Sequence, residues 1–353
     1  MKKITLLLAL SYGFLSHAQI RNKDVYEITE MDVTKVRMEI SIPGFDGYQT
    51  LKCDLHTHTI FSDGLVWPNI RVGEAWKQGL DAVAITDHIE YRPFKDILSG
   101  DLNESYKIAK QASDQVNMII IKGVEITRSK PIGHLNALFI DDANPLDIGD
   151  PLGAIDIAIK QGAFIMWNHP GWPDDKSTLY PVHEELIANK KIHGIEVFNH
   201  IEYYPVAFDW CKEMNLAFMG NSDIHSTTGF EYGNVIRPMT LVFASEKTEE
   251  AIKEALFAGR SAAYFNGELA GRSADLQSLV LASLLVYPVN DKIVEVTNIS
   301  DIPYRMTTNG KLYLFPARKT VSFTKPVAGI FQVENCHVSS TEKLSIPIET
   351  FFP

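Results

Sequence analysis

The chain has 353 residues, of which 45% are hydrophobic and 22% are charged. This composition is typical of globular proteins and excludes collagen-like, coiled-coil and wholly disordered chains. Acidic residues outnumber basic ones by 44 to 33, giving a formal net charge of −11, which argues against a broad basic surface that tracks nucleic-acid backbones. The three cysteines, Cys53, Cys211 and Cys336, are widely spaced, so we expect small buried residues rather than a disulfide framework.

The first 18 residues have the pattern of a secretory signal peptide. Lys2 and Lys3 precede an apolar run over 4–15, and Ser16-His17-Ala18 follows. The run is shorter than the ~20 residues that a membrane-spanning helix needs, and no later segment predicts a span. We therefore expect cleavage near Ala18–Gln19 and an exported protein that is periplasmic or extracellular.

Strand and helix patterns alternate along most of the remaining chain. Residues 19–50 predict an irregular lead-in segment, and residues 51–268 predict a domain of repeated βα units with a parallel sheet, long enough to close into a barrel. The expected strands are 51–56, 81–86, 118–126, 134–140, 163–167, 193–198, 216–220, 240–244 and 261–265. The expected helices are 68–79, 102–115, 151–161, 181–190, 205–214 and 248–258.

The pattern changes in residues 269–353. Short apolar runs, among them 276–286, are separated by Asn, Asp, Gly and Pro, and no helical period of useful length is visible. This pattern predicts a small all-β domain resembling a sandwich.

Polar motifs follow the ends of the predicted strands, where an α/β barrel keeps its active site. They contain Asp54-Leu55-His56-Thr57-His58 with Asp63, Asp87-His88, Glu125, Asn168-His169-Pro170, Glu196 to His200, and Asp223-Ile224-His225. Each motif alone also fits a turn or a helix cap, but their recurrence at successive strand ends favours one shared site.

Residues two apart on a strand share a face, so His56 and His58 point the same way, as do Asp223 and His225. Imidazole and carboxylate ligands together suit Zn, Mn or Fe. Their number exceeds what one ion needs and predicts two to three divalent ions.

These motifs resemble the PHP family, named for polymerases and histidinol phosphatases, over residues 50–265. The specific segments are Asp54-Leu55-His56-Thr57-His58-Thr59-Ile60-Phe61-Ser62-Asp63-Gly64, Ile85-Thr86-Asp87-His88, Gly123-Val124-Glu125, Asn168-His169-Pro170 and Gly220-Asn221-Ser222-Asp223-Ile224-His225. The resemblance implies a distorted (β/α)₇ TIM-like barrel that holds up to three ions.

The resemblance also implies a ligand set. One ion would be held by His56, His58, Glu125 and Asp223, a second by Glu125, His169 and a further ligand, and a third by Asp63, His88 and His225. For the further ligand we choose His200 on strand parity and chemistry, with Asn199 as the alternative.

The export pattern and the β domain resemble a secreted branch of the family that is associated with phosphodiester hydrolysis. We therefore expect a small phosphate-ester substrate, diester or monoester, cleaved through a metal-activated bridging hydroxide. Asp87, His134 and His225 are candidates for the general acid. Arg92 and Arg128 follow two of the motifs and are candidates for phosphate contacts.

Other functions stay open at this point. An amidohydrolase-type C–N hydrolase also opens with HxH on a barrel strand, although that family expects a bridging carboxylated Lys or a lone late Asp. A secreted protein that binds metal or glycans without catalysis is a further alternative. The oligomeric state does not follow from the sequence.

Overall fold

The computed structural model describes residue 24, residues 36–172 and residues 176–352. The predicted leader, and half of the predicted lead-in segment, lie outside these residues. Residues 37–353 form one compact unit. Within the described part of the chain, every helix is too short or too polar to cross a bilayer.

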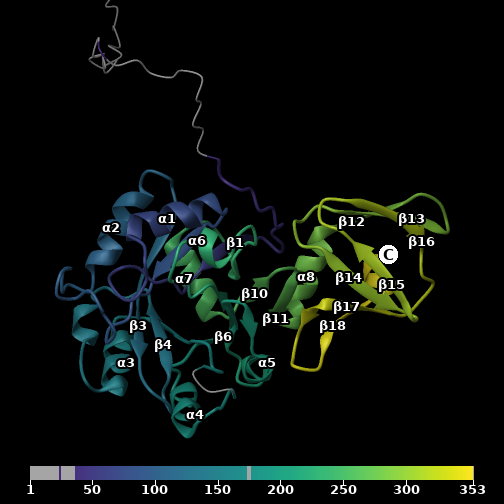
Figure 1. Ribbon diagram of the computed structural model, residues 1–353. Coiled ribbons are helices and arrows are strands. Elements are labelled where there is room, and N and C mark those ends of the chain that lie inside the picture. The colour runs from purple at the N-terminus through teal and green to yellow at the C-terminus, as the bar shows by residue number, and fades with distance from the viewer. Residues whose placement is uncertain (1–23, 25–35, 173–175, 353) are drawn as a thin grey trace, which may run out of the picture. The chain divides into compact units, whose positions relative to one another are not determined.

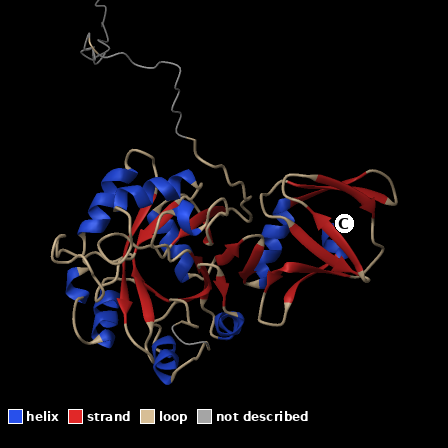
Figure 2. Ribbon diagram, viewed as in Figure 1, coloured by secondary structure: helices blue, strands red, loops and turns tan. Residues whose placement is uncertain are grey.

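The first part of this unit is a mixed α/β structure in which helices lie outside a strand layer (Figures 1 and 2). Its strands are β1 (Gln49–Asp54), β2 (Ala82–Ile85), β3 (Ile119–Thr127), β4 (His134–Leu138), β5 (Phe164–Trp167), β6 (Gly194–Asn199), β7 (Glu202–Tyr203), β8 (Ala217–Asn221), β9 (Met239–Ala244), β10 (Ser261–Phe265) and β11 (Glu268–Gly271). Its helices are α1 (Pro68–Lys77), α2 (Glu104–Ser113), the 3₁₀ helix η1 (Asn144–Leu146), α3 (Pro151–Lys160), α4 (Pro181–Ala188), α5 (Pro205–Glu213), α6 (Thr228–Glu231) and α7 (Glu249–Phe257).

Local sequence explains where these helices begin. Proline opens α1, α3, α4 and α5, where its missing N–H is not needed and its fixed φ suits the first turn. The Asp150 carboxylate accepts a hydrogen bond from the Leu152 N–H at the start of α3, and the Thr248 hydroxyl accepts one from the Ala251 N–H at the start of α7. These five helices begin within one residue of their predicted starts, whereas α6 was not predicted.

The sheet is rich in parallel pairs but not wholly parallel. Strands β1–β2–β3 and β5–β6–β8 pair in parallel, whereas β4 is antiparallel to both β3 and β5, and β9 is antiparallel to β1 and β10. The expectation of a parallel sheet was wrong for β4 and β9. For β4 the reason is the connection, because residues 128–133 contain no helix and return the chain directly as a hairpin.

An isolated parallel bridge joins Thr57 to Ile224, which links the segment after β1 to the segment after β8. The continuous ladder otherwise runs from β7 through β1 to β15. The closed (β/α)₇ barrel stays a prediction.

The C-terminal part begins with a helix, α8 (Ser273–Ser283), followed by β12 (Leu284–Pro288), β13 (Ile293–Asn298), β14 (Tyr304–Thr308), β15 (Lys311–Phe315), β16 (Thr320–Thr324), β17 (Ile330–His337), β18 (Lys343–Pro347) and α9 (Ile348–Phe351). The expectation of strands alone was wrong for residues 273–283. The buried residues Leu276, Leu279, Val280 and Ser283 do have helical spacing, but neighbouring Leu281 and Ala282 make the run read as continuously apolar.

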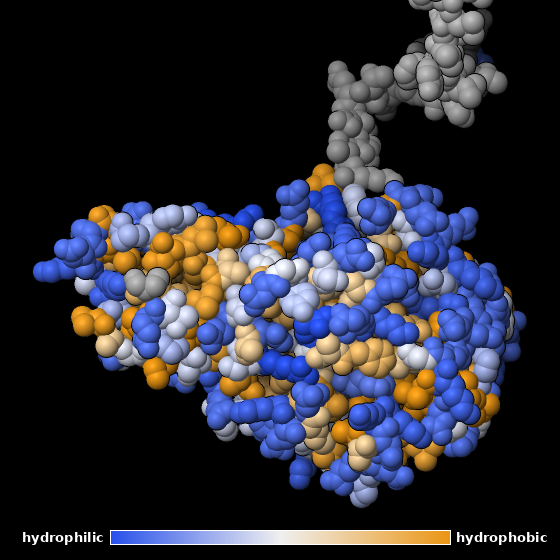
Figure 3. Space-filling model, turned by 180° about the vertical axis from the view of Figure 1, so that it is seen from behind, coloured by the Kyte–Doolittle hydropathy of each residue, from blue (hydrophilic) through white to orange (hydrophobic). Residues whose placement is uncertain are grey.

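The C-terminal strands lie in two layers over a shared core. One layer is the antiparallel sheet β12–β13–β16, and the other continues the main sheet, because β17 pairs in parallel with β11. Val294 and Val296 of the first layer share an apolar cluster with Met306 and Val333 of the second. The outer faces leave large apolar side chains exposed, and apolar surface gathers over this part at the left of Figure 3.

The three cysteines are free and buried, which confirms their expected role as small core residues.

The core position of α8 leads to a stability prediction. Leu279→Ala removes a side chain with no exposed surface and is expected to lower the free energy of unfolding by about 2–5 kcal/mol. Chemical denaturation measures this change. Leu314→Ala, at a position that is 53% exposed, is the matched control and is expected to cost less than about 1 kcal/mol. Equal losses for the two variants would contradict the buried position of α8.

Candidate metal centre

Nine side chains with metal-ligand chemistry meet at one edge of the sheet. They form four overlapping groups: His58, Asp63, His88 and His225; His56, His58 and Glu125; His56, His169 and Asp223; and Glu125, His134 and His169. Within each group, one ligand atom per residue lies within 4.8 Å of the others. The structure thus brings together eight of the nine predicted ligands, and adds His134.

The first group is centred on Asp63, in the loop after β1. Its Oδ1 lies 3.4 Å from His88 Nε2, 3.2 Å from His225 Nε2 and 3.9 Å from His58 Nδ1. The rings of His88 and His225 both stack on His58, with centroids 4.4 and 4.2 Å away. These residues come from the ends of three strands, so the fold, not the local sequence, creates the group.

The next two groups converge on the pair of histidines after β1. His56 Nε2 and His58 Nε2 are 3.1 Å apart, and Asp223 Oδ1 lies 3.1 and 2.9 Å from them. Glu125 Oε2 lies 3.3 Å from each. Two ligand atoms that each lie about 2.0–2.2 Å from the same ion are themselves about 3 Å apart. The distances between these side-chain atoms therefore suit ligands of one ion.

Glu125 joins the groups to one another. Its Oε2 faces His56, His58 and His88 (3.0 Å to Nδ1), and its Oε1 lies 2.6 Å from His134 Nδ1 and 3.8 Å from His169 Nε2. The side chain has no exposed surface. A carboxylate with each oxygen directed at a different group of imidazoles has the arrangement of a bridging ligand.

Unpaired buried atoms test whether divalent ions suit this site. Asp63 Oδ1, Glu125 Oε1 and His134 Nδ1 are buried, and although other ligand atoms lie close to them, none of the three makes a hydrogen bond. Burying such atoms is costly unless something compensates them, and all three belong to the ligand groups. The donor set of imidazole and carboxylate therefore fits divalent metal ions.

The same crowding shifts the protonation of the side chains. Burial, followed by the positive charges of His225 and His88, lowers the pKa of His58 to about 3. Burial also lowers the pKa of His88, but the charges of Glu125 and Asp63 outweigh it and raise that pKa to about 10. For Glu125, burial opposes ionisation, yet the charges of His88 and His56 hold its pKa well below the usual value. The carboxylates are thus ionised and available as ligands.

A cavity of about 490 Å³ opens onto the groups. It is lined by Asp63, His88, Glu125, His134, His169, Trp172, Asn199, His200, Glu202, Tyr204, Asp223, His225 and Glu231. A volume of this size accepts a small molecule. Among the described residues, no Lys or Arg lines it.

Comparisons with known proteins place this arrangement in a family. A model of the PHP domain matches residues 54–217. A two-domain protein from Bacteroides vulgatus, containing a predicted PHP-like metal-dependent phosphoesterase, is 38% identical, with a TM-score of 0.84 over 88% of this chain and 98% of that one. The chain belongs to the PHP family.

Two further relatives match less of the chain. An uncharacterised protein of Methanocaldococcus jannaschii is 35% identical over 81 residues, so the match spans 23% of this chain and 36% of that relative. The lesion-specific endonuclease Q from Pyrococcus furiosus is 16% identical, with a TM-score of 0.43 over 64% of this chain and 59% of that one.

Two of the predicted residues of the PHP site lie apart from the ligand groups. His200 lines the cavity, but its Nδ1 lies 3.2 Å from the Tyr232 hydroxyl, and it belongs to none of the four groups. Asn199 Nδ2 donates to Glu196 Oε2 at 2.8 Å. His134, at the start of β4, lies beside Glu125 instead.

Asp87, a predicted general acid, is fully hydrogen-bonded. Its Oδ1 accepts from the Thr59 N–H at 2.7 Å and the Ser62 hydroxyl at 2.8 Å, and its Oδ2 accepts from the Thr59 hydroxyl at 2.8 Å. These contacts hold the loop that carries Asp63. Asp87 is not among the residues that line the cavity.

The two predicted phosphate-binding arginines are paired elsewhere. Arg92 Nη2 lies 2.7 Å from Asp147 Oδ2. Arg128 forms an ion pair with Glu90, and its Nη2 donates to the Ile148 carbonyl at 2.9 Å. Neither lines the cavity.

The backbone around the site is strained. His169, His200 and Asp223 have φ values of 24°, 50° and 51°, a region that side-chain-bearing residues rarely adopt. Each follows the end of a strand. Such strain persists where surrounding contacts hold it, and it concentrates at functional sites.

Glu196 supports two of the ligand segments, a role that the sequence motifs did not predict. It has no exposed surface, and its Oε1 lies 2.9 Å from His56 Nδ1 and accepts from Asn221 Nδ2 at 3.0 Å. Its Oε2 accepts from the His169 N–H at 2.9 Å. A carboxylate on the far nitrogen of a ligand histidine fixes the ring's orientation and raises its basicity. Its position three residues before the end of β6 was the available signal.

Two buried arginines brace the ligand-bearing segments. Arg71, from α1, donates to the His58 carbonyl at 3.1 and 2.9 Å and to the Ser226 carbonyl at 2.9 Å, which ties the first motif to the last. Arg237 Nη1 lies 3.0 Å from Asp54 Oδ2. Asp54 therefore serves the framework rather than the cavity, and both guanidinium groups have no exposed surface.

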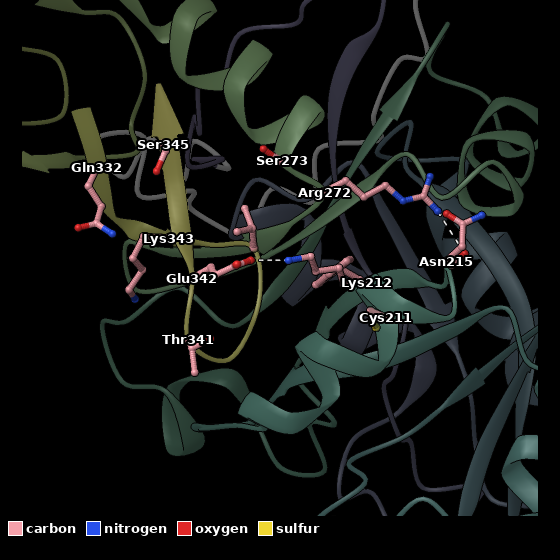
Figure 4. A pocket seen from close by; sticks show the side chains of 12 residues that line it. Cys211, Lys212, Asn215, Arg272, Ser273, Gln332, Thr341, Glu342, Lys343 and Ser345 are labelled. Atoms are coloured by element: carbon pink, nitrogen blue, oxygen red, sulfur yellow. Dashed lines mark hydrogen bonds and ion pairs between the residues drawn. The ribbon is translucent and has the colours of Figure 1, made fainter. Parts of the chain in front are cut away.

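A second cavity of about 640 Å³ lies among α5, the start of α8 and the β17–β18 hairpin (Figure 4). Its charged side chains are largely engaged, because Lys212 pairs with Glu342, and Arg272 Nη2 donates to the Asn215 carbonyl at 3.3 Å. Burial raises the pKa of the Cys211 thiol well above its usual value, which opposes thiolate chemistry. None of the four ligand groups reaches this cavity.

The Arg71 contacts lead to a prediction about metal affinity. Arg71→Met removes the guanidinium that donates hydrogen bonds to the His58 and Ser226 carbonyls. The two loops that carry the ligands are then no longer held in position relative to each other. We expect Mn²⁺ to bind roughly 10–100-fold more weakly, as measured by calorimetry on the full chain. Arg71→Lys is expected to recover only part of the affinity, since one ammonium cannot reach both loops.

Arg318→Met, at an arginine whose side chain is 53% exposed, is the matched control. Near-ultraviolet circular dichroism checks that each variant is folded. If a folded Arg71→Met variant bound Mn²⁺ with the parental affinity, the Arg71 hydrogen bonds would not be needed to position the ligands.

Proposed function

We propose that this PHP protein is a metal-dependent hydrolase of phosphoric esters that cleaves small phosphodiesters and uses two to three divalent ions of Zn, Mn or Fe. The observation that carries the proposal is the buried carboxylate of Glu125, which is shared among the ligand groups at the base of a cavity of ligand size. Family membership agrees with this reaction class.

The ligand groups support an allocation of residues to the ions. His58, Asp63, His88 and His225 would hold one ion, and Glu125, His134 and His169 would hold another. His56, His58, Glu125 and Asp223, which combine members of the remaining two groups, would hold a third. When bound, divalent ions at such a site supply a nucleophile from water near neutral pH and stabilise negative charge on a phosphoryl group.

Charge supports a diester over a monoester. Five carboxylates line the cavity, from Asp63, Glu125, Glu202, Asp223 and Glu231, and no Lys or Arg among the described residues offsets them. A phosphomonoester carries about −1.5 to −2 charges near neutral pH, whereas a diester carries one. The single charge suits a cavity in which only bound cations attract it.

The lining also weighs against a C–N hydrolase of the amidohydrolase type. That class expects a bridging carboxylated lysine, and here the bridging position is occupied by Glu125. A non-catalytic metal-binding protein is also less well supported, because the cavity leaves room for a substrate beside the ligands.

The proton for the leaving alcohol requires a group that is not itself a ligand. Among the predicted acids, His134 and His225 belong to ligand groups, and Asp87 is fully hydrogen-bonded. His200 lines the cavity with a side chain that is 41% exposed, and the Tyr232 hydroxyl orients its Nδ1. We assign the proton to His200, in place of the metal-ligand role that its motif predicts.

The reaction class can be tested with three kinds of substrate. Manganese-loaded full-length protein is expected to hydrolyse bis(p-nitrophenyl) phosphate with a kcat/KM at least tenfold above that for p-nitrophenyl phosphate, and to leave p-nitroanilides intact. Glu125→Gln removes the shared charge and is expected to lower kcat/KM by at least about 100-fold and to lower bound metal.

Glu342→Gln is the matched control, because it changes an exposed carboxylate far from the ligand groups. Turnover of anilides without phosphoesters would favour the C–N hydrolase. Parental activity in Glu125→Gln would refute the shared-carboxylate site.

The role of His200 can be tested with two kinds of leaving group. His200→Gln is expected to lower kcat at least tenfold for a diester with a poor alkoxide leaving group, which needs a proton, and much less for one that releases p-nitrophenolate. If kcat fell equally for both leaving groups and the variant also bound less metal, His200 would be a metal ligand, as its motif predicts.

A further inference from the structure

A third cavity lies beside the metal cavity, on the other side of the turn between β6 and β7. It has a volume of about 350 Å³ and is lined by Phe198, Ile201, Glu202, Tyr203, Phe265, Asn266, Glu268 and His337. Glu202 lines both cavities, and His200 and Ile201 are consecutive residues of the turn that separates them. The two cavities are therefore neighbours that share one wall residue.

One wall of this cavity offers an uncovered apolar face. Ile201 and Tyr203 are 65% and 61% exposed, although both are large apolar side chains. The Tyr203 ring lies at 24° to the ring of Phe208, with centroids 6.4 Å apart. Its large exposed fraction leaves ring surface against which a ring or an alkyl group can pack.

The polar end of the cavity has one uncompensated charge. Glu268 is balanced, because its Oε1 lies 2.6 Å from Arg305 Nη2 and its Oε2 lies 2.9 Å from His337 Nε2. Glu202 is exposed and accepts a hydrogen bond from the Tyr204 hydroxyl at 2.9 Å, and among the described residues no cation pairs with it. A ligand that carries a hydrogen-bond donor or a positive charge would satisfy Glu202.

We infer that this cavity binds one of the two alcohol substituents of the phosphodiester, and that the substituent has an apolar or aromatic ring with a hydrogen-bond donor or a positive charge. This inference rests on the proposed phosphodiesterase function. The phosphate stays at the ligand groups while the ring packs on Tyr203, and the donor meets Glu202. The cavity has the size of a small-ligand site, and Glu202 lines both it and the catalytic cavity.

Three phosphodiesters of equal phosphate charge test this inference. Dimethyl phosphate has no ring, benzyl methyl phosphate adds one, and 4-(aminomethyl)benzyl methyl phosphate adds an ammonium group. Their Kd values are measured by calorimetry on the manganese-loaded full chain. The benzyl compound is expected to bind roughly tenfold more tightly than dimethyl phosphate, and the ammonium compound more tightly still.

Two variants locate the effect. Tyr203→Ala is expected to reduce the benzyl advantage to within about threefold, because the ring loses its packing surface. Glu202→Gln is expected to remove the additional gain from the ammonium group and to leave the benzyl advantage. Tyr287→Ala, at a tyrosine that is 53% exposed in β12, is the matched control and should keep both differences.

The outcomes separate this inference from the proposed function. Hydrolysis of phosphodiesters with no benzyl advantage, or with an advantage that survives in Tyr203→Ala, overturns the subsite and leaves the phosphodiesterase standing. Absence of hydrolysis refutes the phosphodiesterase, and the three Kd values still decide whether the cavity takes a ring.

Discussion

The buried carboxylate of Glu125 is the group on which the rest of the site depends. Removing a carboxylate from water costs several kcal/mol unless opposite charge and hydrogen bonds compensate it. Here the compensation comes from imidazoles carried by four separate segments, after β1, after β2, at the start of β4 and after β5. The strands must therefore meet at one edge for Glu125 to be buried at all. Divalent ions would supply the same compensation in a form that also binds substrate.

The need to hold these segments around Glu125 also explains the hydrogen bonds that Glu196 and Arg71 make behind the ligand side chains. The segments that carry His169 and Asp223 follow the ends of strands and turn sharply with positive φ, so their geometry needs support from other residues. Glu196 supplies it for His56 and His169, and Arg71 supplies it for the segments that carry His58 and His225. These supporting groups are buried and charged. Removing any one of them would therefore destabilise the site, and each supports a particular ligand segment.

The convergence of the predicted ligand side chains could be foreseen because the sequence rules involved are local. Residues two apart share a face, and parallel strands place their carboxyl ends together, so His56, His58, His88 and Glu125 converge without further information. His134 was expected as an acid and not as a ligand, because it begins a strand. Since β4 is antiparallel to β3, Thr127 pairs with His134, and the beginning of β4 lies at the end of β3. Arg71 in α1 has the same local pattern as a surface arginine, so only tertiary structure reveals its role. The helix α8 was missed because it is apolar on more than one face.

Anomalous scattering from crystals of the full chain grown with Mn²⁺ shows directly whether Glu125 is shared between ions. We expect two or three peaks in the cavity, each within bonding distance of one ligand group, with the Glu125 carboxylate shared between at least two of them. A cavity without peaks, or a single peak that leaves both oxygens of Glu125 free, would contradict it.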